Sequence, residues 1–196
     1  MAPFEDLYRN ASDPWGTRTR WYERRKRSLL LAALPAERYG SIYEAGCGTG
    51  HISVELAARC DTLLASDGST AALAGASEVL ADQANAEVAR HTLPADWPQR
   101  RFDLIVLSEI LYFVDEAACR TIAAAARRSA GDAGTVVACD WRAEIDGHGH
   151  SGDAVHRRFD AALNLPKVFE YIDDDFILTG WSADERSVAA REGSRP

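Results

Sequence analysis

The chain has 196 residues, of which 46% are hydrophobic, and it carries a formal net charge of −8. This length fits one domain of ordinary size, so any cofactor and its substrate must share that domain. The acidic balance argues against nucleic acid as a partner, and no apolar run reaches the roughly 18 residues that a membrane span needs.

The N-terminus and the cysteines indicate a reducing compartment. Residues 1–6 lack the basic region and apolar core of a secretory signal, so we expect a cytoplasmic protein. Wide, irregular spacings that match neither a zinc site nor a disulfide framework predict free thiols at Cys47, Cys60, Cys119 and Cys139. A basic cluster at 18–27 lies in a predicted helix and is interpreted as a solvated face.

The apolar periodicity predicts alternating helices and strands. A helix over 21–34, ended by Pro35, comes first. The next elements are a strand at 41–45, a helix at 52–59, a strand at 62–67, a helix at 69–86 capped by Ser69, strands at 87–91 and 102–108, a helix at 117–130, a strand at 134–140, a helix at 152–163, and strands at 167–172 and 176–181. The tail, 184–196, has little to bury and is expected to fray.

This order predicts an α/β fold in a single domain over 1–196. Strands that alternate with helices form a parallel sheet with helices on both faces. The last two predicted strands, joined by a short turn, add an antiparallel edge. We therefore expect a Rossmann-like three-layer αβα sandwich around a mostly parallel seven-stranded sheet with an antiparallel C-terminal edge.

A glycine-rich turn follows the first predicted strand. Gly46, Gly48 and Gly50 are two residues apart, and Glu44 precedes the first of them by two. Glycines there let the backbone turn sharply and approach a ligand. The spacing differs from the dinucleotide fingerprint, and Glu44 suits a ligand with an ammonium group and no phosphate. Asp67, at the tip of the second predicted strand, is placed to bind a ribose diol.

These features favour S-adenosylmethionine over a nicotinamide cofactor. A nicotinamide-dependent oxidoreductase is the alternative from another enzyme class, disfavoured by the glycine spacing and the lack of a second domain. A non-catalytic scaffold that keeps the cofactor fold is a further alternative. The intact glycines, Glu44 and Asp67 argue against loss of the pocket.

The sequence resembles class I S-adenosylmethionine-dependent methyltransferases in three successive motifs: 44–50, Asp67 and 102–113. Asp13-Pro-Trp15, the stretch 21–26 and the stretch 108–112 more narrowly resemble the nodulation protein S-like branch, whose namesake N-methylates a deacetylated chitooligosaccharide. The resemblance covers roughly residues 4–182. It implies a methyl transfer from S-adenosylmethionine to a small-molecule acceptor, most simply an amine.

The resemblance also implies which residues bind the cofactor. The helical N-terminal part, 1–34, would cover it, with Lys26 at the place of a family arginine and paired with its carboxylate. Thr92 stands where related enzymes often have an aspartate for the adenine amino group. The expected cofactor-binding residues are Trp15, Tyr22, Lys26, Glu44, Gly46, Cys47, Gly48, Gly50, Asp67, Gly68, Thr92, Leu93 and Ser108.

The acceptor site is expected at the carboxyl ends of the fourth and fifth strands. An amine must attack in its neutral form, so a nearby carboxylate, imidazole or phenol would take the proton. Glu109 is the leading candidate for this base, and Tyr112 and His150 are the next two. Asp140 and His148 are further candidates. Flexible glycines between the histidines, and no fixed fourth ligand, argue against a metal site at His148, His150 and His156. An O-methyltransferase would share every cofactor residue, so oxygen remains an alternative acceptor.

Overall fold

A computed structural model describes residues 2–143 and 150–194. The helices are α1 (Ala2–Asn10), α2 (Trp21–Ala33), α3 (Ser53–Ala57), α4 (Thr70–Val79), the 3-10 turn η1 (Leu111–Phe113), α5 (Glu116–Ala130), α6 (Gly152–Leu163) and α7 (Val188–Arg191). The strands are β1 (Tyr39–Ala45), β2 (Cys60–Asp67), β3 (Ala86–Arg90), β4 (Leu104–Ser108), β5 (Thr135–Trp141), β6 (Lys167–Ile172) and β7 (Phe176–Ser182).

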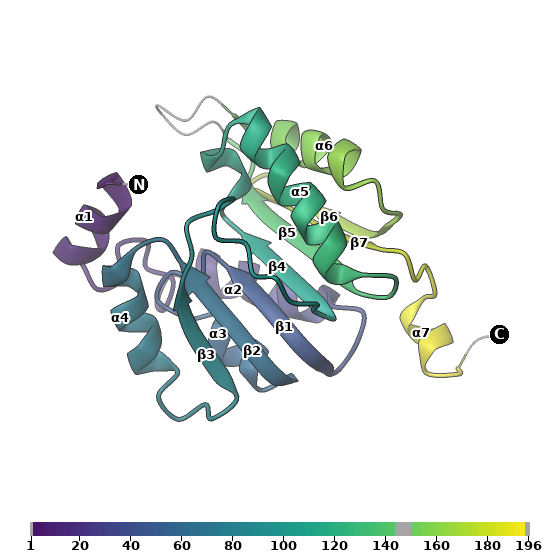
Figure 1. Cartoon of the computed structure of the whole chain (residues 1–196), viewed down its shortest axis with the longest axis horizontal. Coiled ribbons are helices and arrows are strands. Elements are labelled where there is room, and N and C mark those ends of the chain that lie inside the picture. The colour runs from purple at the N-terminus through teal and green to yellow at the C-terminus, as the bar shows by residue number, and fades with distance from the viewer. Residues whose placement is uncertain (1, 144–149, 195–196) are drawn as a thin grey trace.

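The seven strands form one twisted sheet in the order β3-β2-β1-β4-β5-β7-β6 (Figure 1). The first five are parallel, and β7 pairs antiparallel with both β5 and β6. This confirms the predicted αβα sandwich with its antiparallel C-terminal edge. None of the helices within the described ranges has the length and apolar character that crossing a membrane requires.

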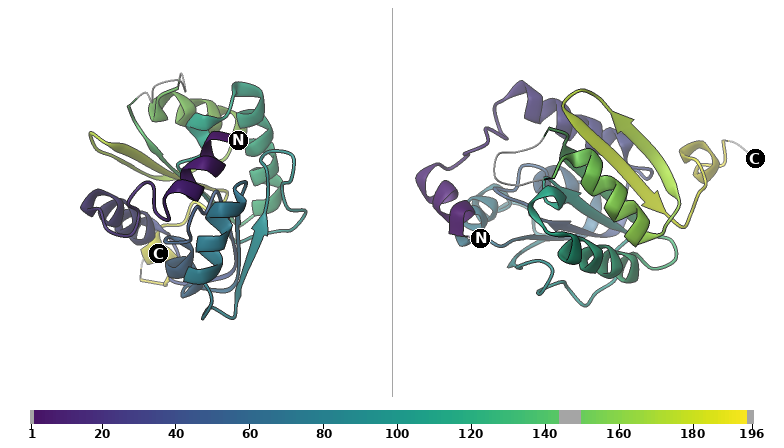
Figure 2. Two further views of the ribbon diagram at one scale, coloured as in Figure 1. Left: turned by 90° about the vertical axis from the view of Figure 1, so that its left-hand side faces the viewer. Right: turned by 90° about the horizontal axis from the view of Figure 1, so that it is seen from above.

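Helices cover both faces of the sheet (Figure 2). An apolar core lies between the sheet and the helices on each face. Alternate residues of each central strand enter opposite cores, because successive side chains of a strand point to opposite faces. Ile105 and Leu107 of β4 pack toward α5 and α6, whereas Leu104 and Val106 pack toward α2, α3 and α4. Strand β4 is fully buried, as its unbroken apolar sequence predicts for a central parallel strand.

Most element boundaries lie within two residues of prediction, and the largest difference is at the end of α4. The helix predicted over 69–86 ends at Val79, although Ser69 caps it as expected by accepting from the Ala72 amide. The Asn85 side-chain amide donates to the carbonyls of Ala57 and Cys60, which holds the turn that leads into β3. An alanine-rich sequence contains no local signal that ends a helix, so the sequence did not predict the contacts of Asn85 or the end of α4. The helix predicted over 52–59 is confined to α3.

The chain termini contain two further helices that the sequence did not single out. Helix α1 precedes the predicted N-terminal helix, and α7 lies within the tail, where Arg191 donates to the Asp184 carbonyl (Figure 1). All four cysteines lie among the described residues, and each is a buried free thiol, as expected.

Candidate active site

The glycine-rich loop connects β1 to α3 and has three positive φ angles. Gly46, Gly48 and Gly50 have φ values of 68°, 54° and 82°, a region that other residues adopt only under strain. At Gly50 the packing is also tight, because an added Cβ would lie 3.1 Å from the Ala76 Cα in α4. The Cys47 amide donates to the Ser66 carbonyl of β2 and fixes the loop to the neighbouring strand.

Two carboxylates flank this loop. Glu44, in β1, is 2% exposed, and its Oε2 accepts no hydrogen bond from any residue within 2–143 or 150–194. Burial raises the pKa of Glu44 to about 8. Asp67, at the end of β2, accepts from the amides of Gly48 (3.0 Å) and Ser69 (2.8 Å), and burial raises its pKa. A buried acceptor without a donor beside this glycine-rich loop fits a ligand that carries an ammonium group.

Helix α1 lies against this loop, a contact that the sequence reasoning missed. Glu5 accepts from the Ser69 hydroxyl at 2.7 Å, and the ring of Phe4 meets that of Phe113 edge-on at 4.7 Å. A methyl group at Gly48 would lie 3.0 Å from the Tyr8 hydroxyl. The spacing of Phe4 and Tyr8, one helical turn apart, was the available signal for a helix with one buried face.

The predicted N-terminal aromatic residues differ in their surroundings. Trp15 is 42% exposed and lies beside the Tyr8 hydroxyl. Tyr22 packs edge-on against Trp141, with ring centroids 5.4 Å apart. The Tyr22 hydroxyl is buried and has no partner in the part of the chain that the structure describes. Tyr22 therefore presents a second polar atom without a partner near the end of β5.

Lys26 and the residues after β4 form one polar cluster. The Lys26 ammonium lies 2.5 Å from Glu109 Oε1 and 3.0 Å from Glu23. The other oxygen of Glu109, Oε2, accepts from the Tyr112 hydroxyl at 2.6 Å and from the Trp141 amide at 3.2 Å. Burial raises the pKa of Glu109, and the adjacent Lys26 partly offsets that rise. Glu109 has a φ of 58°, so this backbone is held in a conformation rare for a glutamate.

Lys26 is thus bound by two protein carboxylates rather than lying free. Burial lowers the pKa of Lys26, but Glu109 and Glu23 raise it by more, so the side chain stays protonated. An ammonium has three donors, and these contacts use two of them. The third donor is available to a further acceptor such as a cofactor carboxylate.

The remaining predicted site residues lie around these clusters. Ser108 is buried at the end of β4, the Thr92 amide donates to Asp96, and the Gly68 carbonyl accepts from Arg90. Leu93, beside Thr92, packs against the core on the α5 side of the sheet.

Asp140 and His150 each have partners other than Glu109. His150 bonds to Arg158 at 3.1 Å, and His148 lies outside the described residues. Asp140 has no exposed surface and is engaged by the Leu111 amide and by His156. Within the described ranges, no three His, Cys, Asp or Glu side chains converge as metal ligands do.

Comparison with known proteins places the chain in a family. Residues 42–144 match the family model described as a methyltransferase domain. A protein from Pseudomonas syringae described as a methyltransferase shares 42% identity, with 83% of this chain and 99% of that chain covered and a TM-score of 0.74.

Two more distant structures share the fold. N-methyltransferase NodS from Bradyrhizobium japonicum WM9, solved with S-adenosyl-L-homocysteine, is 21% identical, with coverage of 92% and 96% and a TM-score of 0.79. An O-methyltransferase family protein from Burkholderia thailandensis is 14% identical, with coverage of 91% and 60% and a TM-score of 0.73. No curated protein matches the sequence. The domain model and the Pseudomonas syringae protein together show that the chain belongs to the methyltransferase domain family, as a class I S-adenosylmethionine-dependent methyltransferase.

Proposed function

We propose that this methyltransferase acts on a small-molecule amine, such as an amino sugar, rather than on an oxygen acceptor. The observation that carries the proposal is the charge of the cluster formed by Glu23, Lys26 and Glu109. Two carboxylates share one ammonium there, so the cluster has a net charge of about −1 when all three are ionised. A partly buried negative site favours an acceptor that arrives as a cation.

The cofactor half of the proposed site consists of the glycine loop and its neighbours. S-adenosylmethionine supplies an electrophilic methyl group when bound. The unpaired oxygen of Glu44 would accept from the ammonium group of S-adenosylmethionine, Asp67 would accept from the ribose hydroxyls, and the third N–H of Lys26 would donate to the cofactor carboxylate. Helices α1 and α2 form the proposed N-terminal cap over these groups, with Trp15 and Tyr22 as its aromatic contacts.

The acceptor half centres on Glu109. A carboxylate has about four lone-pair positions, and Lys26, Tyr112 and Trp141 occupy three of those on Glu109. The fourth receives an N–H of the acceptor and then its proton, which leaves the amine neutral for attack. The upward shift that burial gives the Glu109 pKa strengthens it as a base. His150 is proposed to contact the acceptor from the loop before α6.

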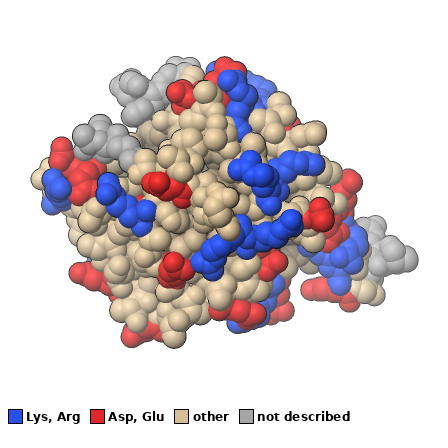
Figure 3. Space-filling view, viewed as in Figure 1, with Lys and Arg blue, Asp and Glu red and all other residues tan. Residues whose placement is uncertain are grey.

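The surface supports a small acceptor rather than a polyanion. Both signs of charge occur over the face shown in Figure 3, and the net charge of the chain is −8. A protein that binds a phosphate backbone needs a strongly positive surface.

The test is a methyl-transfer assay by mass spectrometry, with glucosamine as the amine, N-acetylglucosamine as the control without one, and catechol as an oxygen acceptor. We expect transfer to glucosamine or to another primary amine in a panel. The Glu109→Gln variant should lose about 100-fold in rate while keeping its affinity for S-adenosyl-L-homocysteine. Glu116→Gln, at an exposed pair with Arg120, should change neither property. Methylation of catechol without any amine would establish the O-methyltransferase alternative instead.

A further inference from the structure

Strand β5 forms hydrogen bonds with the segment that carries Glu109. The Glu109 amide donates to the Cys139 carbonyl at 2.7 Å, and the Trp141 amide donates to Glu109 Oε2 at 3.2 Å. Between them, Asp140 Oδ1 accepts from the Leu111 amide at 3.1 Å. Cys139 and Asp140 therefore hold the backbone of a segment in which Glu109 has a φ of 58°, and Trp141 holds the Glu109 side chain. A conformation of this kind persists only where the surroundings fix it.

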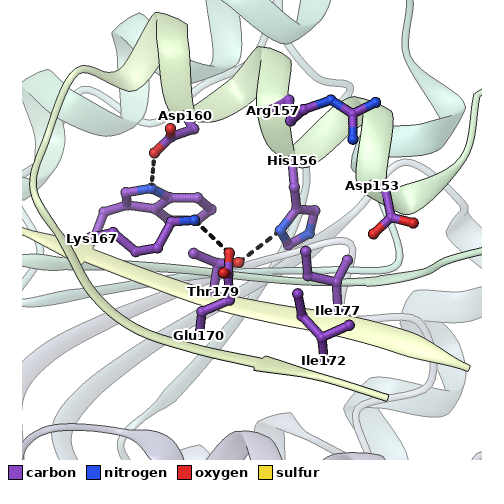
Figure 4. A pocket seen from close by; sticks show the side chains of 10 residues that line it. Asp153, His156, Arg157, Asp160, Lys167, Glu170, Ile172, Ile177 and Thr179 are labelled. Carbon is purple, nitrogen blue, oxygen red and sulfur yellow. Dashed lines mark hydrogen bonds and ion pairs between the residues drawn. The ribbon is translucent and has the colours of Figure 1, made fainter. Parts of the chain in front are cut away.

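The second oxygen of the Asp140 carboxylate forms a hydrogen bond with a histidine of α6. His156 Nε2 lies 3.0 Å from Asp140 Oδ2, and His156 Nδ1 lies 3.0 Å from the Thr179 hydroxyl of β7. Asp140 and Thr179 are fully buried, and His156 is 3% exposed. Figure 4 shows the imidazole extending from α6 toward Thr179, at the wall of a cavity of about 250 Å³.

The hydrogen bonds assign a role to each ring nitrogen. A carboxylate accepts, so Nε2 donates to Asp140, and in the neutral ring Nδ1 then accepts from the Thr179 hydroxyl. Both nitrogens are occupied inside the protein, which leaves neither for a substrate proton or a metal. A carboxylate with no exposed surface needs such a donor, because an unpaired buried charge is costly.

We infer that His156 is a positioning residue for methyl transfer. It fixes the rotamer of Asp140, Asp140 fixes the Leu111 amide, and that amide sets the backbone between Glu109 and Tyr112. The inference rests on the proposed role of Glu109 in the acceptor site. It adds α6 and β7 to the parts of the fold that determine the geometry of that site.

Site-resolved amide hydrogen exchange by NMR tests the inference on the full chain, with and without S-adenosyl-L-homocysteine. In His156→Ala the Leu111 amide should exchange at least about tenfold faster than in the wild type. His156→Gln should restore most of the protection, because its amide donates near the position of Nε2. Thr179→Val, which keeps His156 in place, should give a smaller change in the same direction and serves if His156→Ala does not fold.

The matched control is Asp160→Ala. Asp160 lies one turn after His156 on α6 and accepts from the Trp181 indole of β7 at 2.6 Å (Figure 4). This variant therefore also removes a hydrogen bond between α6 and β7. It should lower stability without exposing the Leu111 amide. Unchanged Leu111 exchange in His156→Ala, or equal acceleration in Asp160→Ala, would overturn the inference.

Two readouts separate this inference from the proposed function. Binding of S-adenosyl-L-homocysteine should stay within about twofold of the wild type in His156→Ala, because the glycine loop is untouched. For any amine that the wild type methylates, kcat should fall about tenfold while KM for S-adenosylmethionine stays constant. Amide exchange needs no acceptor, so a failed amine screen would refute the proposed function and leave this result intact. A loss confined to KM for S-adenosylmethionine would count against a positioning role.

Discussion

Replacing Glu44 by glutamine probes the buried carboxylate beside the glycine loop. Burial and, to a smaller extent, Asp67 raise the pKa of Glu44 from 4.5 to about 8, and Ser53 partly offsets the rise. A group whose pKa is raised on folding contributes stability that is fully present below 4.5 and is lost as the pH rises through 8. Each pH unit in this window costs about 1.4 kcal/mol, so the cost reaches roughly 3 kcal/mol by pH 7.

Glutamine is neutral and nearly isosteric, so Glu44→Gln should remove this pH dependence. Urea unfolding without ligand is expected to show the variant up to about 3 kcal/mol more stable than the wild type at pH 7, with the difference shrinking toward pH 5.5. Glu55→Gln, at an exposed position on α3, is the control and should follow the wild type. Parallel stability curves for the wild type and Glu44→Gln would refute the reasoning.

The same variant connects stability to binding. If Glu44 meets the ammonium group of the ligand, binding S-adenosyl-L-homocysteine near pH 7 should ionise it and release up to about one proton. Calorimetry in buffers with different ionisation enthalpies measures that proton. Glu44→Gln should bind more weakly and release none. Equal proton release in both proteins would show that another group titrates.

Two further substitutions have matched controls within the chain. Gly50→Ala should lower the free energy of unfolding in urea by roughly 2–4 kcal/mol, because it adds a close contact with the α4 backbone to the strain of a φ of 82°. The control is Gly193→Ala, where φ is 72° and the space is open. It should lower the free energy of unfolding by about 1–2 kcal/mol, from the backbone strain alone. Lys26→Met should cost roughly 3 kcal/mol at neutral pH and less at pH 5, because the Glu109 pKa rises further without its partner; a loss independent of pH would contradict this. Lys167→Met, at an exposed pair, should change stability by less than about 0.5 kcal/mol.

The sequence predicted those parts of the molecule that depend on local pattern. The order of strands and helices, the capping role of Ser69 and the free thiols follow from periodicity, residue type and spacing, and the structure confirms them. The end of α4 was not predictable, because the anchor that stops it is a bond from Asn85 to residues in another turn. The bounds of α1 were not predicted for a related reason, since it contacts the glycine-rich loop and the start of α4, 40 or more residues away.

The cofactor and acceptor halves of the proposed site also differ in how the sequence specifies them. The cofactor half is formed by one continuous loop and the ends of two strands, so its glycines and carboxylates stand in a recognisable order. The acceptor half brings Lys26 from α2 against Glu109 after β4, with Trp141 of β5 as a third contributor. Contacts between residues 83 and 32 positions apart leave no local pattern. Because Lys26 is proposed to reach both the cofactor carboxylate and Glu109, we expect its substitution to weaken S-adenosylmethionine binding and to change acceptor methylation together.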